Sequence, residues 1–318
     1  MENKCNVFKM EVEVAARRSF VSRCIASIAF AICELLRRWF IWIITAGPIP
    51  KHVAIIMDGN RRYAARRQME KTSGHQFGYD SLMHTLRDCF DLGIKCVSVY
   101  AFSIENFKRS KEEVATLMNL MQEKLEALIE KESMVTEYGI RVQVLGELSL
   151  LPESVRRAAE KAMAMSRGNE KAVLNIFAPY TSTQEIVKAV ENVRHEVLTR
   201  KIEVHEKIHG FHSQDDDDGS ITEEIHGLQS SVTEDEIERH LYTADCGEPQ
   251  LLIRTSGEIR LSNFLLWQSS FTFLYVTPVL WPEFSFWQLV KAILDYQKAY
   301  PLLQQKKRQL KSLISRNA

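Results

Sequence analysis

An aspartate that directly follows an apolar strand is the first residue from which chemistry can be argued. The apolar run of residues 52–57 ends in Asp58-Gly59-Asn60, and Arg61-Arg62 follow where a helix should begin. Open α/β sheets bind ligands at the carboxyl ends of their strands, and the free N–H groups at a helix start attract anions. A carboxylate beside an anion site suggests a bridging Mg²⁺. The segment predicts a phosphorylated substrate held by backbone, arginine and metal; the alternative is an Asx turn before an ordinary helix.

A second segment has the same organisation. Arg254 closes the apolar run that begins at Gln250, Arg260 and Ser262 follow on a polar turn, and an apolar stretch after them predicts a helix. Two arginines and a hydroxyl can clamp a diphosphate through charge-assisted, bidentate hydrogen bonds. The alternative is that these are two surface arginines in a loop, which is the commoner case for any pair of arginines. Two anion sites at strand ends nevertheless indicate two phosphorylated substrates, or one with two ends.

A third strand, from Ser98, delivers polar side chains into one short loop: Ser103, Glu105, Asn106 and Arg109. They offer donors, acceptors and charge without the Ser-His-Asp or Cys-His pattern of acyl transfer. Ser110 with Glu113 three residues later predicts the capping box of the next helix. Capping explains Ser110 but leaves Asn106 and Arg109 unexplained.

The elements that must position these residues alternate along the chain. Strands are expected at 52–57, 96–102, 141–145, 172–177, 251–254 and 271–277, and helices at 79–92, 111–138, 153–166, 183–200, 233–242 and 285–313. This alternation predicts an α/β fold with a mostly parallel six-stranded central sheet covered by helices. No Gly-x-Gly-x-x-Gly follows a strand, so the usual dinucleotide fold is not supported.

Composition narrows the class of protein. The 318 residues include 41 Lys plus Arg and 41 Asp plus Glu, and no basic stripe interleaved with aromatics appears, so nucleic-acid binding is not expected. The six cysteines are scattered without a Cys-x-x-Cys pair. They are typical of free thiols in a reducing compartment rather than of disulfides or a zinc site.

The first 47 residues form a separate region that ends at the breaker cluster Gly47-Pro48-Ile49-Pro50. Residues 19–46 are rich in apolar side chains but are interrupted by charges, which argues against a transmembrane span or a signal peptide. The cluster Arg37 to Trp42 suits a membrane interface. An amphipathic helix that associates with a membrane or with a partner protein is predicted, and packing within the domain is the alternative.

The main domain is expected to span 48–318, with an acidic insert at about 201–231. The insert contains His205, His209 and His212 and the run Asp215 to Asp218. A histidine-rich metal site and an aspartate-rich Mg²⁺-diphosphate motif are both conceivable. Consecutive aspartates repel one another, however, and a mobile solvated loop is the preferred interpretation.

Taken together, these motifs resemble the cis-prenyltransferases, the family of undecaprenyl and dehydrodolichyl diphosphate synthases. The residues that carry the resemblance are His52–Ala64, Gly74-His75, Tyr100–Arg109, Ile253–Gln268 and Leu280–Glu283. The variants Asn60–Tyr63, Phe102–Lys111 and Arg254–Glu258 look like the eukaryotic dehydrodolichyl type, a catalytic subunit, rather than the bacterial one. The resemblance implies Mg²⁺-dependent elongation of an allylic diphosphate, farnesyl diphosphate, with isopentenyl diphosphate, and an apolar tunnel for the growing chain.

The resemblance also implies a role for each matching residue. Asp58 would hold Mg²⁺ and assist departure of the diphosphate, and Asn106 would lie near the proton that leaves. The remaining residues implied to bind substrate are Gly59, Asn60, Arg61, Arg62, Tyr63, Lys71, His75, Ser103, Glu105, Phe107, Arg109, Arg254, Arg260 and Ser262. His75 could equally be a structural histidine. Tunnel-lining candidates are Leu82, Leu86, Phe90, Leu117, Met118, Leu120, Met121, Leu125 and Leu128.

Three departures from the family pattern accompany the resemblance. Phe273 stands where bacterial relatives carry a metal-binding glutamate, Lys71 stands where arginine is common, and residues 304–318 lack an Arg-x-Gly motif. The resemblance therefore implies a Nogo-B-receptor-like accessory subunit that supplies this motif, at the cytosolic face of the endoplasmic reticulum membrane. An accessory lipid-binding subunit, a rubber-type long-chain enzyme and an unrelated phosphohydrolase are the alternatives. A haloacid-type hydrolase would need a second aspartate where Asn60 stands.

Overall fold

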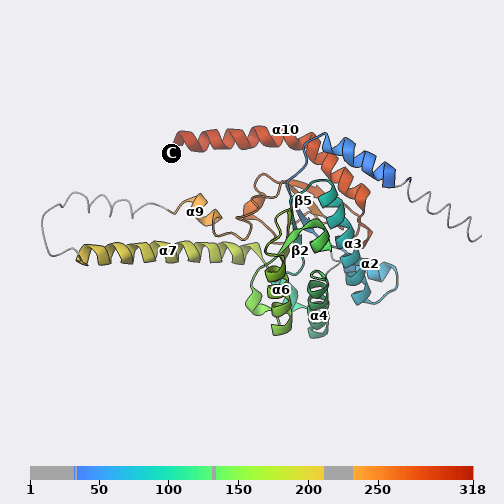
Figure 1. The fold of residues 1–318 in the computed structure, drawn as a ribbon, viewed down its shortest axis with the longest axis horizontal. Coiled ribbons are helices and arrows are strands. Elements are labelled where there is room, and N and C mark those ends of the chain that lie inside the picture. Colours follow the sequence, from blue (N-terminus) through green and yellow to red (C-terminus); the bar gives the residue numbers. More distant parts are fainter. Residues whose placement is uncertain (1–31, 33, 131–133, 211–231, 318) are drawn as a thin grey trace, which may run out of the picture. The chain divides into compact units, whose positions relative to one another are not determined.

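The computed structural model describes residues 32, 34–130, 134–210 and 232–317, and its contacts divide the chain into Met1–Ile49 and Pro50–Ala318 (Figure 1). The second unit contains a six-stranded sheet in the order β3-β4-β2-β1-β5-β6. The strands are β1 His52–Ile56, β2 Cys96–Tyr100, β3 Ile140–Leu145, β4 Ala172–Phe177, β5 Leu251–Arg254 and β6 Phe273–Val276. Every pairing is parallel, which confirms and sharpens the predicted α/β class.

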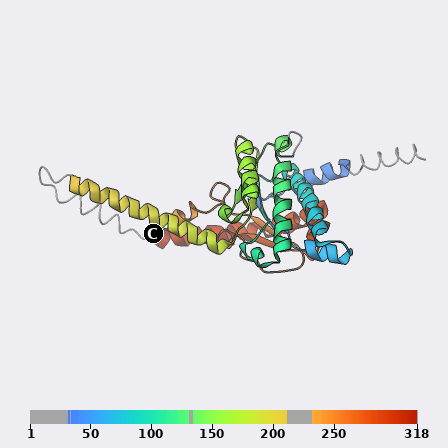
Figure 2. The ribbon, with the colours of Figure 1, turned by 90° about the horizontal axis from the view of Figure 1, so that it is seen from below.

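The central strands are buried because helices cover both faces of the sheet. All residues of β1 and β5 are buried, as expected for parallel strands with apolar runs. The helices of this unit are α2 Asn60–Arg66, α3 Lys71–Asp91, α4 Lys111–Ala127, α5 Met134–Tyr138, α6 Glu153–Ser166, α7 Ser182–Gly210, α9 Glu234–Glu238 and α10 Phe286–Asn317. In Figure 1, α4 and α6 lie on the side of strands β2 and β5 opposite to α10, and Figure 2 shows α4 beside α6.

Several predicted element boundaries need correction. Helix α3 begins at Lys71 rather than at residue 79, since Gly74 and Gly78 stay within it and let α2 approach closely. The helix predicted over 111–138 is two helices, α4 and α5. No long helix follows Ser262; turns and the short 3₁₀ helix Trp267–Ser269 take its place. Helix α7 continues to Gly210, beyond the predicted end at residue 200. The rest of the predicted insert, residues 211–231, lies outside the described part of the chain.

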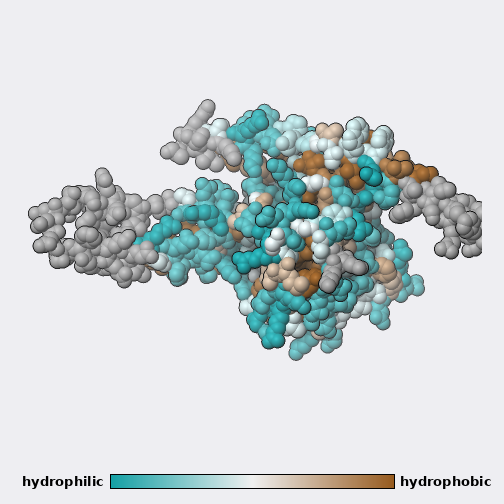
Figure 3. All heavy atoms as spheres, viewed as in Figure 1, coloured by the Kyte–Doolittle hydropathy of each residue, from teal (hydrophilic) through white to brown (hydrophobic). Residues whose placement is uncertain are grey.

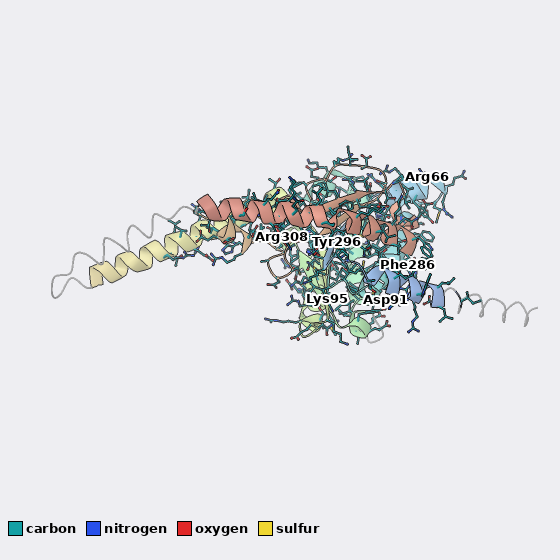
Figure 4. All side chains as sticks on the ribbon, turned by 90° about the horizontal axis from the view of Figure 1, so that it is seen from above. Arg66, Asp91, Lys95, Phe286, Tyr296 and Arg308 are labelled. Atoms are coloured by element: carbon teal, nitrogen blue, oxygen red, sulfur yellow. The ribbon has the colours of Figure 1, made fainter. Side chains whose placement is uncertain are left out.

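The long C-terminal helix α10 covers the β5–β6 side of the sheet. Figure 4 follows it from Phe286 past Tyr296 to Arg308. Leu289, Ala292 and Ile293 on its inner face are fully buried, at helical spacing. The helix therefore protects strands that would otherwise expose one face.

The first unit contains a helix over residues 34–45. Leu35, Trp39 and Trp42 are exposed on it, and hydrophobic residues gather over this helix in Figure 3. Within the described residues, none of the helices combines the length and the apolar character needed to span a bilayer.

Candidate active site

The parallel pairing of β1 with β2 on one side and β5 on the other brings three strand ends to one edge of the sheet. Asp58 follows β1, Ser103 follows β2, and Arg254 ends β5. The side chains after these strands line one concavity, which we call the charged hollow. Its lining includes Asp58, Gly59, Asn60, Arg61, Arg62, His75, Ser103, Glu105, Asn106, Arg109, Arg254, Glu258, Arg260 and Ser262.

An ion pair between Asp58 and Arg254 forms the floor of the charged hollow. Arg254 Nη2 lies 2.9 Å from Asp58 Oδ2, and the arginine side chain is only 4% exposed. Burial by itself would raise the pKa of the Asp58 carboxyl, but hydrogen bonds from Arg254 and Ser256 and the charges of Arg254 and Arg62 outweigh it and hold the pKa below its usual range. Asp58 is therefore a carboxylate at neutral pH.

Residues directly after Arg254 complete the support of Asp58. The hydroxyl of Thr255 accepts from the Asp58 backbone N–H at 2.9 Å and donates to the Asp58 carbonyl at 2.6 Å. Arg62 Nη2 donates to the Ser256 hydroxyl at 2.5 Å and lies 3.4 Å from Asp58 Oδ1. Thr255 and Ser256 had no predicted role, although both stand inside the Ile253–Gln268 motif.

Gly59 lets the chain turn from β1 into α2. Its φ of 113° lies in the left-handed region, and a Cβ atom there would come within 2.9 Å of Leu280 Cδ2. Gly59 therefore aims the start of α2, with Asn60 and Arg61, at the hollow.

The loop after β2 forms the opposite wall. Ser103 caps the 3₁₀ helix Ile104–Lys108: its hydroxyl accepts from Glu105 N at 3.2 Å, while Asn106 Oδ1 accepts from Ser103 N at 3.1 Å. The carbonyl oxygen of the Asn106 amide is thus fixed by the backbone. Its NH₂ group has no recorded partner among the described residues.

Arginine side chains make the remaining walls electropositive, and a neutral histidine lies among them. Arg254 Nη1 donates to Ser262 Oγ at 2.7 Å and to the carbonyl of Arg260. Burial, followed by the charge of Arg109, lowers the pKa of His75 to about 4, so this imidazole is neutral at pH 7. Asn60 Oδ1, His75 Nε2 and Arg254 Nε are buried without a hydrogen-bond partner in the described structure. Such groups are expected where a polar ligand completes the site.

An apolar pocket opens from the charged hollow between α3 and α4. The two concavities share Met57, Asn60 and His75 in their linings. The rest of the lining is mostly apolar. It includes seven of the predicted tunnel residues: Leu82, Leu86, Leu117, Leu120, Met121, Leu125 and Leu128. Two predicted tunnel residues do not line it: Met118 is buried in the core, and Phe90 packs against Tyr138 with ring centroids 5.9 Å apart.

Comparison with known proteins shows the family to which this chain belongs. The family model described as putative undecaprenyl diphosphate synthase matches residues 56–301. The chain belongs to the undecaprenyl diphosphate synthase family. As a member, it is a cis-prenyltransferase, an enzyme that elongates prenyl diphosphates.

Named relatives of this cis-prenyltransferase cover most of its length. Dehydrodolichyl diphosphate synthase CPT3 of Solanum lycopersicum is 43% identical over 280 residues, 87% of this chain and 94% of that protein. Dehydrodolichyl diphosphate synthase complex subunit DHDDS of Homo sapiens is 42% identical over 271 residues, 85% of this chain and 74% of that protein. Among solved structures, lavandulyl diphosphate synthase from Lavandula x intermedia with dimethylallyl diphosphate matches with a TM-score of 0.65 and 32% identity, covering 78% of this chain and 95% of that one.

Not every residue that the resemblance assigned lines the charged hollow of this cis-prenyltransferase. Tyr63 is buried behind it, with its ring 5.7 Å from that of Phe77. Phe107 packs edge-on against Phe102 at 4.9 Å. Neither side chain is among those that line the hollow in the described structure, and their binding role stays a prediction. Lys71 begins α3, and its side chain lies outside the described structure.

Proposed function

We propose that the chain condenses isopentenyl diphosphate with farnesyl diphosphate at the charged hollow and passes the growing polyprenyl chain into the apolar pocket, giving a dehydrodolichyl-type product. The observation that supports this most directly is the shared lining of the two concavities. An allylic diphosphate is anionic at one end and apolar at the other. A charged site that opens into an apolar one fits both ends of that molecule.

The charges divide the hollow into two diphosphate sites. On one side, Gly59, Asn60, Arg61, Arg62 and Arg109 would bind the allylic diphosphate, with His75 as a neutral hydrogen-bonding group. On the other side, Arg254, Arg260 and Ser262 would bind isopentenyl diphosphate. Asn106, whose NH₂ group is directed by the cap at its carbonyl oxygen, would orient the reacting alkene where it loses a proton.

The carboxylate oxygens of Asp58 are suitable ligands for a Mg²⁺ ion. In the described residues, no group of three or more His, Cys, Asp or Glu side chains could hold a metal. Magnesium sites are commonly built from one or two carboxylates together with substrate phosphates and water, so Asp58 with a bound diphosphate supplies a suitable set. The ion, when bound, would neutralise the charge that develops on the departing diphosphate. Phe273 lies in β6 and offers no oxygen ligand.

We further propose that the active enzyme is a complex at the cytosolic face of the endoplasmic reticulum membrane. The human relative is named as a complex subunit, and residues 304–318 contain no Arg-x-Gly motif. A Nogo-B-receptor-like subunit would supply that motif. The exposed Trp39 and Trp42 suit a helix at a bilayer surface, where tryptophan side chains concentrate.

The test is incorporation of labelled isopentenyl diphosphate with farnesyl diphosphate and Mg²⁺, by the chain alone and co-expressed with an Arg-x-Gly subunit. Long polyprenyl products only in the complex are expected, and product length separates a dolichol-type enzyme from one that makes far longer polymers. Products from the chain alone would contradict the partner proposal. Failure of both samples, with the Asp58→Asn complex as the matched blank, would contradict the proposed reaction.

A further inference from the structure

Two arginines of the charged hollow share one carboxylate, which belongs to Glu113. Arg109 Nη1 lies 2.9 Å from Glu113 Oε1, and Arg61 Nη1 lies 3.7 Å from the same oxygen. In the described part of the chain, both arginines line the hollow whereas Glu113 does not. The carboxylate therefore holds the two arginines without itself lining the hollow.

Three separate elements meet at this carboxylate. Arg61 lies on α2, Arg109 ends the 3₁₀ helix after β2, and Glu113 lies in the first turn of α4. The backbone N–H of Glu113 also donates to Ser110 Oγ at 3.2 Å, which fixes the start of α4. Glu113 thus joins the wall that carries Asn60 and Arg61 to the wall that carries Asn106.

The positive charges of Arg61 and Arg109 explain why a carboxylate is needed between them before substrate binds. Arg61 and Arg109 are close enough to repel: burial and then the charge of Arg61 lower the pKa of the Arg109 guanidinium, and the charge of Glu113 opposes this shift. Long guanidinium side chains lose much rotamer freedom when they bind, and a partner that holds them beforehand lowers that entropic cost.

We propose that Glu113 is a positioning residue for the allylic diphosphate, which holds Arg61 and Arg109 side by side before the substrate binds. The inference rests on the proposed assignment of these two arginines to the allylic substrate. The residues assigned to isopentenyl diphosphate have other partners, since Arg254 pairs with Asp58 and Arg260 with Glu258. Loss of Glu113 should therefore affect the two substrates unequally.

The experiment uses Glu113→Gln in the full complex. The neutral amide keeps the shape and removes the charge. We expect the KM for farnesyl diphosphate to rise about tenfold, because a charge-assisted pair is lost from both arginines. The KM for isopentenyl diphosphate should stay within about twofold. Glu113→Asp, which keeps the charge, should recover part of the loss. Glu112→Gln is the matched control, since it removes an exposed carboxylate from the same turn and should match the wild type.

A binding measurement keeps this inference separate from the proposed reaction. Calorimetric titration with farnesyl thiodiphosphate, which resists diphosphate departure, should give a Kd about tenfold weaker for Glu113→Gln than for the wild type. If the wild-type complex fails to elongate, the proposed reaction is wrong and this titration still decides the role of Glu113. Equal rises in both KM values would show a purely structural role. A lower KM for farnesyl diphosphate would show that Glu113 competes with the ligand. An unchanged Kd would likewise overturn the inference.

Discussion

The two ends of the parallel strands carry polar clusters of opposite character. We call them the carboxyl edge, where the charged hollow lies, and the amino edge, toward the starts of the strands. At the carboxyl edge, Asp58 and Arg254 face a hollow in which three buried polar atoms have no partner within the described structure. At the amino edge, His52 on β1 lies 2.7 Å from Ser98 Oγ and 2.8 Å from the carbonyl of Gly247. Asn175 Nδ2 donates to the same serine hydroxyl at 3.1 Å.

The difference shows how one sheet separates binding from stability. Polar groups of the amino edge are almost all satisfied by one another, with only Asn175 Oδ1 lacking a partner in the described structure, so the cluster contributes to folding. The groups of the carboxyl edge are held in place but incompletely satisfied, so they are prepared for a ligand. Substitutions at the two edges should therefore have opposite effects on activity and stability.

The largest effect is expected from Asp58→Asn at the carboxyl edge. The amide can still accept from Arg254, so the fold should survive, but the charge needed beside the departing diphosphate is lost. We expect kcat to fall by roughly 10³-fold, the upper range for removing one electrostatic group. Steady-state incorporation of isopentenyl diphosphate measures this. Activity within a factor of ten of the wild type would break the assignment of Asp58.

The reverse result is expected from His52→Ala at the amino edge. The variant leaves Ser98 Oγ and the Gly247 carbonyl short of a buried partner and creates a cavity. The free energy of unfolding should fall by about 3 kcal/mol, while kcat per folded molecule stays near the wild-type value. Urea unfolding together with an activity assay tests both parts. A stable variant with reduced kcat would mean that the amino edge takes part in catalysis.

The same histidine should make stability depend on pH. Burial lowers the pKa of His52 to about 4, although its hydrogen bond to Gly247 partly opposes the shift. The unfolded chain therefore binds this proton first as the pH falls, so the contribution is complete above about pH 6.5 and declines toward pH 4. From this shift we expect the wild type to lose about 2 kcal/mol of stability between pH 7.5 and 5 through His52 alone.

Urea unfolding at the two pH values should show a smaller loss in His52→Ala by about this amount. His84→Ala, which removes an exposed histidine, is the control and should retain the wild-type loss. Identical pH dependence in all three proteins would rule out His52 as the cause.

The smallest effect is expected at Cys246, whose sulfur accepts a hydrogen bond from Asn175 of the amino-edge cluster. The hydrogen bond with Cys96 is the main cause that lowers the pKa of Cys246 to about 7, while burial holds the pKa of Cys89 far above its usual range. Cys246 is half-buried, and Cys89 and Cys96 are fully buried free thiols. Iodoacetamide should therefore modify Cys246 with a half-maximal rate near pH 7, with little change in activity. Residue-resolved mass spectrometry would detect the opposite order of reactivity if this edge opens readily.

The local pattern of the sequence was enough for most of the fold. Apolar runs ending in polar residues predicted six strands, and parallel pairing followed from their alternation with helices. The predicted helix boundaries were wrong where packing between elements outweighed the local preference of the sequence. The helix was expected to begin at residue 79, yet α3 already includes Gly74 and Gly78, which leave room for Asn60 of α2 to pack against them. The apolar stretch after Ser262 predicted a helix, but turns and a 3₁₀ segment bury Phe264 and Leu265 beneath the hollow.

For the site, the sequence by itself determined which residue types stand at the strand ends, because charge, glycine and arginine spacing are local properties. Only the tertiary structure decided which of them share a wall. The pairing of Asp58 with Arg254 joins residues 196 positions apart, and Thr255 and Ser256 acquire their roles through the same pairing of β1 with β5. Tyr63 and Phe107 belong to the motif but pack against Phe77 and Phe102, because the direction of a side chain depends on what packs against it. Glu113 was predicted as part of a helix cap. Its pairing with Arg109 is local, four residues along the chain, but its contact with Arg61 exists only because the tertiary structure places α2 beside the start of α4.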